Sequence, residues 1–242
     1  MNSSRLPGKV LKKICGKPML LWQVERIRQS KYVKDVIIGT STSNDDDEIE
    51  DFCINNEIKY FRGPENDVLQ RISLLIYQFN IDLHVESFGD SPLIDPNIID
   101  QFIIYYLRNK ENVDFVSNTL KTTFPPGQEV LVYPGALLMK INKILKKNDP
   151  LREHVGYNIT RGLGNFRIHQ IEAKRQYNEP DIYLEVDTDV DFQLISKIIE
   201  NFEKKKEYNF NLSDILKFLK NNPNLILLNQ SIDRKWRVFR EK

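Results

Sequence analysis

Basic and hydroxyl side chains crowd the start of the chain, where residues 3–9 read Ser-Ser-Arg-Leu-Pro-Gly-Lys ahead of a predicted helix. Backbone N–H groups, cations and a helix N-terminus are the groups that bind a triphosphate. The GxxxxGK[ST] pattern of a Walker A loop is absent. A basic tail without function would have the same composition, so this segment alone leaves both readings open. The candidate nucleotide-binding residues in it are Ser3, Ser4, Arg5, Gly8 and Lys9.

Two aspartates stand at the ends of predicted strands. Asp90 follows the run 81–88 in Gly89-Asp90-Ser91, and Asp187 lies at the end of the alternating segment 181–188. Carboxylates from two separate strand ends can hold one Mg²⁺, which in turn binds phosphate oxygens. Each aspartate alone is equally typical of an ordinary turn. Together with the basic opening loop, they favour a metal and phosphate site.

Strands and helices alternate through the first half of the chain. Apolar and β-branched runs predict strands at 36–40, 59–63, 81–88 and 113–117, and helical spacing predicts helices at 19–29, 68–79 and 97–107. This alternation predicts βαβ units and a mostly parallel sheet, with ligands at the carboxyl ends of its strands. Gly39-Thr40, Arg62-Gly63 and Gly89-Asp90 should then share one rim. The acidic residues 45–48 are read as a helix start rather than a metal site.

The second half is less regular. Residues 121–160 combine Pro125-Pro126-Gly127 with a short alternating stretch and predict a lid or an antiparallel addition. Residues 181–188 alternate as a strand with one buried face, and 192–202 and 212–219 predict helices. We therefore expect one domain over 1–242, with the lid or insertion around 121–160 and a helical extension over 205–242.

Composition excludes several classes of protein. The 242 residues carry a net charge of +1 from 35 basic and 34 acidic side chains, which gives no argument for a nucleic-acid partner. No apolar stretch is long enough to insert in a membrane, and the polar N-terminus does not resemble a signal peptide. Cys15 and Cys53 lack metal-ligand spacing, so we expect reduced thiols and a cytoplasmic location.

Six motifs in chain order resemble one known family. They are SSRLPGKVL, TSTSNDDDEI, FRGPENDVLQR, FGDSPLIDP, PLREHV and VDTDVDF, with a closing Arg-Lys-Trp at 234–236. The chain resembles the cytidylyltransferases that make CMP-Kdo and CMP-sialate, and most of all the SpsF-like branch of spore coat polysaccharide biosynthesis. The resemblance implies a Rossmann-like, three-layer α/β nucleotidyltransferase fold, Mg²⁺, and transfer of CMP from CTP to a sugar or sugar acid. Pyrophosphate would be released, and the product would serve cell-surface polysaccharide synthesis. Relatives of this type are often homodimers.

The resemblance also implies roles for individual residues. Arg5, Lys9, Asp90 and Asp187 would be catalytic, and Asp90 and Asp187 would ligate the metal. The nucleotide would be bound by the opening loop together with Arg71, Gly89 and Asp90. The acceptor sugar would be bound by Gln128, Glu129, Arg152, Glu153 and His154.

The sequence departs from the family pattern at its beginning. The family has a buried strand ending in Ala-Arg just before the position of Met1, and neither is present here. We therefore expect a sheet that lacks its first strand, from a start codon further upstream or a truncated gene. Two other classes stay open: a glycosyltransferase that uses sugar nucleotides, and a truncated, non-catalytic nucleotide-binding protein. GTP is also compatible with the sequence.

Overall fold

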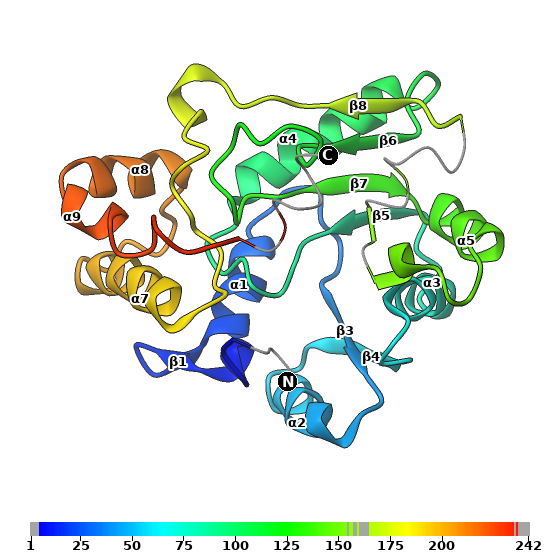
Figure 1. Cartoon of the computed structure of the whole chain (residues 1–242), viewed down its shortest axis with the longest axis horizontal. Coiled ribbons are helices and arrows are strands. Elements are labelled where there is room, and N and C mark those ends of the chain that lie inside the picture. Colours follow the sequence, from blue (N-terminus) through cyan, green and yellow to red (C-terminus); the bar gives the residue numbers. More distant parts are fainter. Residues whose placement is uncertain (1–4, 154, 157–158, 160–164, 235, 237–242) are drawn as a thin grey trace.

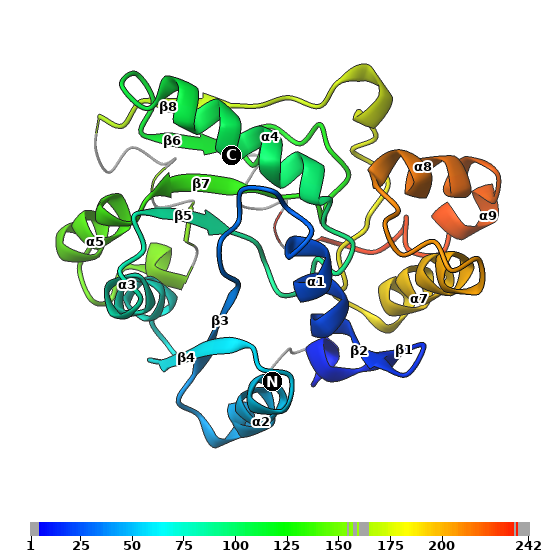
Figure 2. The same ribbon diagram turned by 180° about the vertical axis from the view of Figure 1, so that it is seen from behind.

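The computed structural model describes residues 5–153, 155–156, 159, 165–234 and 236 (Figures 1 and 2). No helix in these ranges is both long enough and apolar enough to span a bilayer. The strands are β1 (Lys13–Ile14), β2 (Lys17–Pro18), β3 (Ile37–Ser41), β4 (Lys59–Gly63), β5 (Leu83–Glu86), β6 (Phe115–Ser117), β7 (Leu131–Pro134) and β8 (Ile168–Gln170). The α-helices are α1 (Met19–Ile27), α2 (Asp47–Asn55), α3 (Val68–Gln78), α4 (Pro96–Asn109), α5 (Gly135–Ile144), α7 (Asp189–Lys204), α8 (Leu212–Lys220) and α9 (Pro223–Ile226). The 3₁₀ helices are η1 (Lys9–Leu11), η2 (Asn44–Asp46), η3 (Pro150–Glu153) and η4 (Arg175–Tyr177).

The main sheet is mixed. Its four strands lie in the order β5-β7-β6-β8, and β3 pairs with β4 in a separate parallel pair. The expected mostly parallel sheet fits in part: β6 and the unpredicted strand β8 are parallel, but β7 runs antiparallel to both β5 and β6. The expected antiparallel addition within 121–160 is therefore an interior strand of this sheet. The division of the chain into a domain, a lid and an extension stays a prediction.

Side chains of β7 alternate between two apolar layers. Leu131 and Tyr133 pack in a cluster with residues of α3 and α5. Val132 packs in a second cluster with residues of α4, α7 and α8. Successive strand residues point to opposite faces, so a strand that is buried on both faces must be apolar throughout. The result is the expected three-layer arrangement, with helices on both sides of the sheet (Figures 1 and 2).

Side-chain caps fix several of the predicted helix starts. Asp67 accepts a hydrogen bond from the Gln70 N–H at the start of α3. Asp95 accepts one from the Asn97 N–H and so caps α4, in which Pro96 is the first residue. Asn211 caps α8. Asp46 is buried and accepts from the hydroxyls of Thr40 and Ser41 and from the Ser41 N–H. These contacts are those of a turn that leads into α2, as expected for its acidic first turn.

The predicted strand over 181–188 is wrong. These residues follow an irregular course with turns and bends, and they belong to none of the three sheets. Their backbone bonds go to loops instead: the Leu184 N–H donates to the Pro126 carbonyl (2.7 Å) and the Val186 N–H to that of Asp90 (2.8 Å). Residues 182–186 are all buried, including Glu185, so both sides of the segment face protein. The alternating pattern therefore predicted burial of one face of this segment, whereas the structure buries both.

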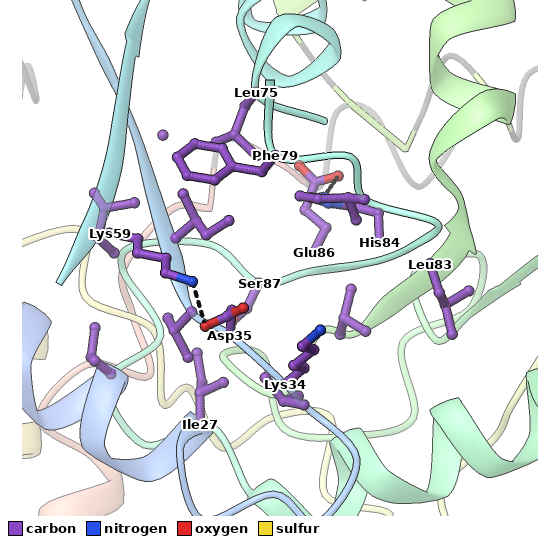
Figure 3. Close-up of a pocket in the computed structure, with 18 of the residues that line it drawn as sticks. Ile27, Lys34, Asp35, Lys59, Leu75, Phe79, Leu83, His84, Glu86 and Ser87 are labelled. Carbon is purple, nitrogen blue, oxygen red and sulfur yellow. Dashed lines mark hydrogen bonds and ion pairs between the residues drawn. The ribbon is translucent and has the colours of Figure 1, made fainter. Parts of the chain in front are cut away.

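A cavity of about 570 Å³ separates β3 from β5. Each of these strands pairs on only one side among the described strands, with β4 and β7 respectively. Residues of both strands line the cavity, and α1, α3 and α4 contribute mostly aliphatic side chains (Figure 3). Gly89 borders it, and Val10 of η1 lies next to Gly89. The mostly aliphatic lining and the open edges of β3 and β5 agree with the expectation of a missing strand.

An apolar strand placed in this cavity is expected to stabilise the protein. Fusing about six β-branched residues ahead of Met1 would pair open backbone groups of β3 and β5 and bury apolar side chains worth about 1.5–3 kcal/mol each. We expect the melting temperature to rise by several degrees and the amides of β3 and β5 to exchange hydrogen more slowly. A Gly/Ser segment of equal length is the control. Equal melting temperatures for the two fusions would contradict this prediction.

A buried carboxyl group in the wall of the cavity makes stability depend on pH. The Tyr133 hydroxyl donates to Glu86 Oε2 (2.6 Å), and His84 Nε2 lies 3.9 Å from the same oxygen. Figure 3 shows His84 and Glu86 side by side. Burial raises the pKa of Glu86 to about 7, although the bond from Tyr133 lowers it. Burial lowers the pKa of His84 to about 4, so this histidine is neutral over most of the relevant range.

Glu86 is expected to destabilise the fold as the pH rises. Its pKa is higher in the folded chain than the unfolded value of 4.5, so folding is most favoured while the carboxyl is protonated. The contribution of Glu86 to stability should fall by about 3 kcal/mol between pH 4.5 and 7, while the lowered pKa of His84 acts in the opposite direction between pH 4 and 6.5. Glu86→Gln should remove this decline, as measured by urea unfolding at several pH values. Parallel pH profiles of the wild type and the variant would refute the assignment.

Candidate active site

The opening loop is anchored by an apolar residue and then turns sharply. Leu6 is buried in the main core, and Gly8 has a left-handed backbone (φ 66°) directly before η1. This turn directs Arg5 and Lys9 to the same neighbours, although they lie four positions apart. Ser3 and Ser4 fall outside the described residues, so their assignment to the nucleotide stays a prediction.

The two aspartates are brought together by backbone contacts. Asp90 lies in the turn after β5, where the Ser91 N–H bonds to the Phe88 carbonyl. The bond from the Val186 N–H to the Asp90 carbonyl ties this turn to the segment that contains Asp187. Two acids 97 positions apart in the sequence are thereby held side by side.

Lys9 lies between these two carboxylates. Its Nζ is 3.3 Å from Asp90 Oδ2, 3.2 Å from Asp187 Oδ1 and 2.6 Å from the Val186 carbonyl. Arg5 Nη2 donates to the other oxygen of Asp187 at 2.5 Å. The opening loop, the turn after β5 and the segment ahead of α7 therefore meet at one point, which is the geometry that the sequence predicted.

Burial strengthens the charge interactions in this cluster. It lowers the pKa of Lys9, but the carboxylates of Asp90 and Asp187 outweigh it, and the net shift is upward. Burial also raises the pKa of Asp90, with Lys9 opposing and Asp187 adding to the shift. The cluster holds two acids together only because cations lie between and beside them.

Two further acids approach the same point. Glu129 is buried and accepts a hydrogen bond from the Gly127 N–H (2.7 Å). Glu185 is buried and accepts one from Trp236 Nε1 (2.6 Å). Burial and the neighbouring Glu129 and Asp90 raise the pKa of Glu185 to about 8. The sequence reasoning missed Glu185, because the alternation around it predicted an exposed face.

Comparison with known proteins assigns this arrangement to a family. The model of the cytidylyltransferase family matches residues 1–222. The chain belongs to the cytidylyltransferase family. It is 30% identical over 227 residues to the spore coat polysaccharide biosynthesis protein SpsF of Bacillus subtilis, covering 92% of each chain. The chain is therefore a nucleotidyltransferase, as the sequence resemblance implied.

Solved structures support the same fold. A cytidylyltransferase from Leptospira borgpetersenii superposes with a TM-score of 0.88 at 29% identity, over 97% of this chain and 95% of that one. A CMP:2-keto-3-deoxy-manno-octonic acid synthetase complexed with CTP superposes with a TM-score of 0.61 at 16% identity, over 83% of this chain and 95% of that one. At this lower identity the second likeness concerns the fold alone.

Other residues that the sequence assigned to the cytidylyltransferase site have different partners. Arg71 donates to the carbonyls of Pro64 (2.9 Å) and Glu65 (3.3 Å) in the loop after β4. Gly63 lies against it, because a Cβ at Gly63 would come within 2.9 Å of the Arg71 side chain. The structure thus holds Arg71 on the β4 side, and its role toward the nucleotide stays a prediction.

The predicted acceptor residues are scattered. Gln128 is fully buried, accepts from the Asp95 N–H and donates to the Leu93 carbonyl. Arg152 is buried and donates to Asp67 (2.9 Å), which caps α3. Glu153 is exposed, and His154 lies outside the described residues. Among the predicted acceptor residues that the structure describes, Glu129 is the one that lies near Asp90 and Asp187. The acceptor roles of all these residues stay predictions.

Proposed function

We propose that this cytidylyltransferase transfers CMP from CTP to a sugar or sugar acid, with release of pyrophosphate, for the synthesis of a cell-surface polysaccharide. The main support is the meeting of Arg5 and Lys9 with Asp90 and Asp187. Cations from the opening loop suit a triphosphate, and paired carboxylates suit the cation that accompanies it. The proposed base follows the cytidylyltransferase family, and the proposed acceptor follows relatives, one named for polysaccharide biosynthesis and another a 3-deoxy-manno-octulosonate cytidylyltransferase 31% identical over 98 residues.

The donor set at this point fits Mg²⁺. Asp90 and Asp187 offer hard oxygen ligands, and Lys9 Nζ shows that a positive charge can lie between them. No group of three or more His, Cys, Asp and Glu side chains is arranged to hold a metal within the residues described. The protein would therefore supply two carboxylate ligands, and phosphate oxygens and water would complete the coordination shell, as is usual for Mg²⁺. When bound, the ion would neutralise charge on the phosphates.

The residues of the chain act by positioning and by charge. An oxygen of the acceptor attacks the α-phosphorus in line with the leaving pyrophosphate, so that one P–O bond forms as the other breaks. Arg5 and Lys9 would bind the triphosphate and stabilise the charge that develops on the leaving oxygens. Gly89 lies close to η1, because a Cβ at this position would be in ordinary contact with Val10 at 3.8 Å. The proton of the acceptor hydroxyl passes to a base or to water.

Release of pyrophosphate tests this proposal. The purified protein is incubated with Mg²⁺, each of the four nucleoside triphosphates and a panel of sugar acids and sugar phosphates. We expect release that depends on both CTP and one acceptor class, and a CMP-linked product by mass spectrometry. If the enzyme prefers GTP, the proposed base would be wrong, but the proposed reaction type would stand. Consumption of a UDP-sugar without pyrophosphate, or binding of nucleotide without turnover, would overturn the proposal in favour of a glycosyltransferase or a non-catalytic protein.

A further inference from the structure

The C-terminal segment returns to the site after α9. Figure 1 shows this red segment running from α9 back toward the centre of the molecule. Arg5 Nη1 donates to the Asp233 carbonyl at 3.0 Å, and Trp236 binds Glu185. A segment more than 220 positions from the opening loop thus contacts the same cluster. None of the proposed steps uses these contacts.

Among the described residues after α9, Arg234 is the most deeply buried charge. Its side chain is 0% exposed, its Nη2 donates to Asp191 Oδ1 at 2.8 Å, and its guanidinium lies 4.3 Å from the centre of the Tyr183 ring. Asn229 donates to the same Asp191 oxygen at 2.7 Å. A buried ion pair is tolerated only when its geometry is good and its partners are bonded, and loss of one partner leaves an uncompensated charge.

The other oxygen of Asp191 binds the backbone beside the proposed cation ligand. Asp191 Oδ2 accepts from the N–H of Asp187 (3.1 Å), from the N–H of Thr188 (2.8 Å) and from the Thr188 hydroxyl (2.8 Å). The Asp187 carboxylate in turn binds Arg5 and Lys9. A continuous series of bonds therefore runs from Arg234 through Asp191 to the backbone of Asp187.

We propose that Arg234 is a positioning residue, which through Asp191 fixes the backbone at Asp187 and so sets where the carboxylate of Asp187 meets the cation. The inference rests on the proposed function, because it takes Asp187 as a cation ligand. Capping of α7 alone does not require Arg234, since Thr188 and Asp191 already form a complete capping box. The arginine adds a fixed orientation of the Asp191 carboxylate in a site closed to water. Groups that orient a metal ligand in this way commonly change metal affinity by roughly 10–100-fold when removed.

Binding of Mn²⁺, followed by electron paramagnetic resonance with and without CTP, measures this role without turnover. We expect Arg234→Met to weaken Mn²⁺ binding by about tenfold or more, and Arg234→Lys, which keeps the charge but loses the planar fork, to weaken it less. Arg26→Met is the matched control. Arg26 is also buried, stacks 4.3 Å from the Phe210 ring and bonds to the carbonyls of Ile94 and Phe210. This control should lose stability with no change in Mn²⁺ affinity.

The possible outcomes separate the inference from the function on which it rests. Wild-type Mn²⁺ affinity in a folded Arg234→Met protein, or an equal loss in Arg26→Met, would overturn the role of Arg234. If Arg234→Met fails to fold, Arg234→Lys and Asp191→Asn test the role of Arg234 instead. Unchanged Mn²⁺ affinity in both variants would also overturn that role. Absence of Mn²⁺ binding by the wild type, with CTP present, would instead refute the cation site itself.

Discussion

Asp90→Asn and Asp187→Asn should each abolish Mg²⁺-dependent release of pyrophosphate from CTP while leaving the chain folded. An amide keeps the shape of the carboxylate and one acceptor oxygen, but it removes the negative charge that attracts both Lys9 and the cation. Loss of one group that stabilises charge in a transition state typically costs about 100- to 1000-fold in rate. The measurement is a coupled pyrophosphate assay over a range of Mg²⁺ concentrations, with circular dichroism as the check of folding.

Asp189→Asn is the matched control for this experiment. Asp189 lies two positions from Asp187, at the start of α7, but its side chain is 69% exposed and pairs with Lys12 on the surface. An exposed pair of this kind contributes little, so the control should keep nearly the full rate. Near-normal turnover in both Asp90→Asn and Asp187→Asn would eliminate these residues as cation ligands and remove the main support for the proposed mechanism.

Lys9→Met is expected to have two effects of opposite sign. Turnover of CTP should fall by roughly 100-fold, because a cation that binds the triphosphate is lost. In the free protein, however, the Lys9 ammonium lies where it neutralises both Asp90 and Asp187. Its removal should therefore make the pair of carboxylates bind Mn²⁺ more tightly in the absence of nucleotide.

Lys12→Met provides the comparison for Lys9→Met. Lys12 follows η1 directly, but it contacts exposed Asp189 and the Phe192 ring instead of the buried acids. We expect this variant to leave both turnover and Mn²⁺ affinity nearly unchanged. Wild-type turnover in Lys9→Met would rule out a role for Lys9 at the triphosphate. Unaltered or weaker Mn²⁺ binding in Lys9→Met would show that the ammonium and the cation do not compete for the same carboxylates.

Much of the first half of the fold could be read from local patterns. The strands β3 and β4 fall within one residue of their predicted positions, and Asp67 and Pro96 begin α3 and α4 as expected. Caps and apolar periodicity act over a few residues, so a single sequence displays them directly. The expectation of an unfilled strand position also agrees with the cavity between β3 and β5, since two strands with one open side each now line it.

The sequence by itself indicated which chemical groups the site would contain: the cations of the opening loop and the acids Asp90 and Asp187. Only the tertiary structure decided the interior position of β7 between β5 and β6, the absence of a strand at 181–188, the burial of Glu185 and the bond from Arg234 to Asp191. Each of these depends on which distant segment lies alongside, and Arg234 is 43 positions from its partner. Local periodicity reports that one face of a segment is buried, but contacts that close long loops are selected by the packing of the whole core.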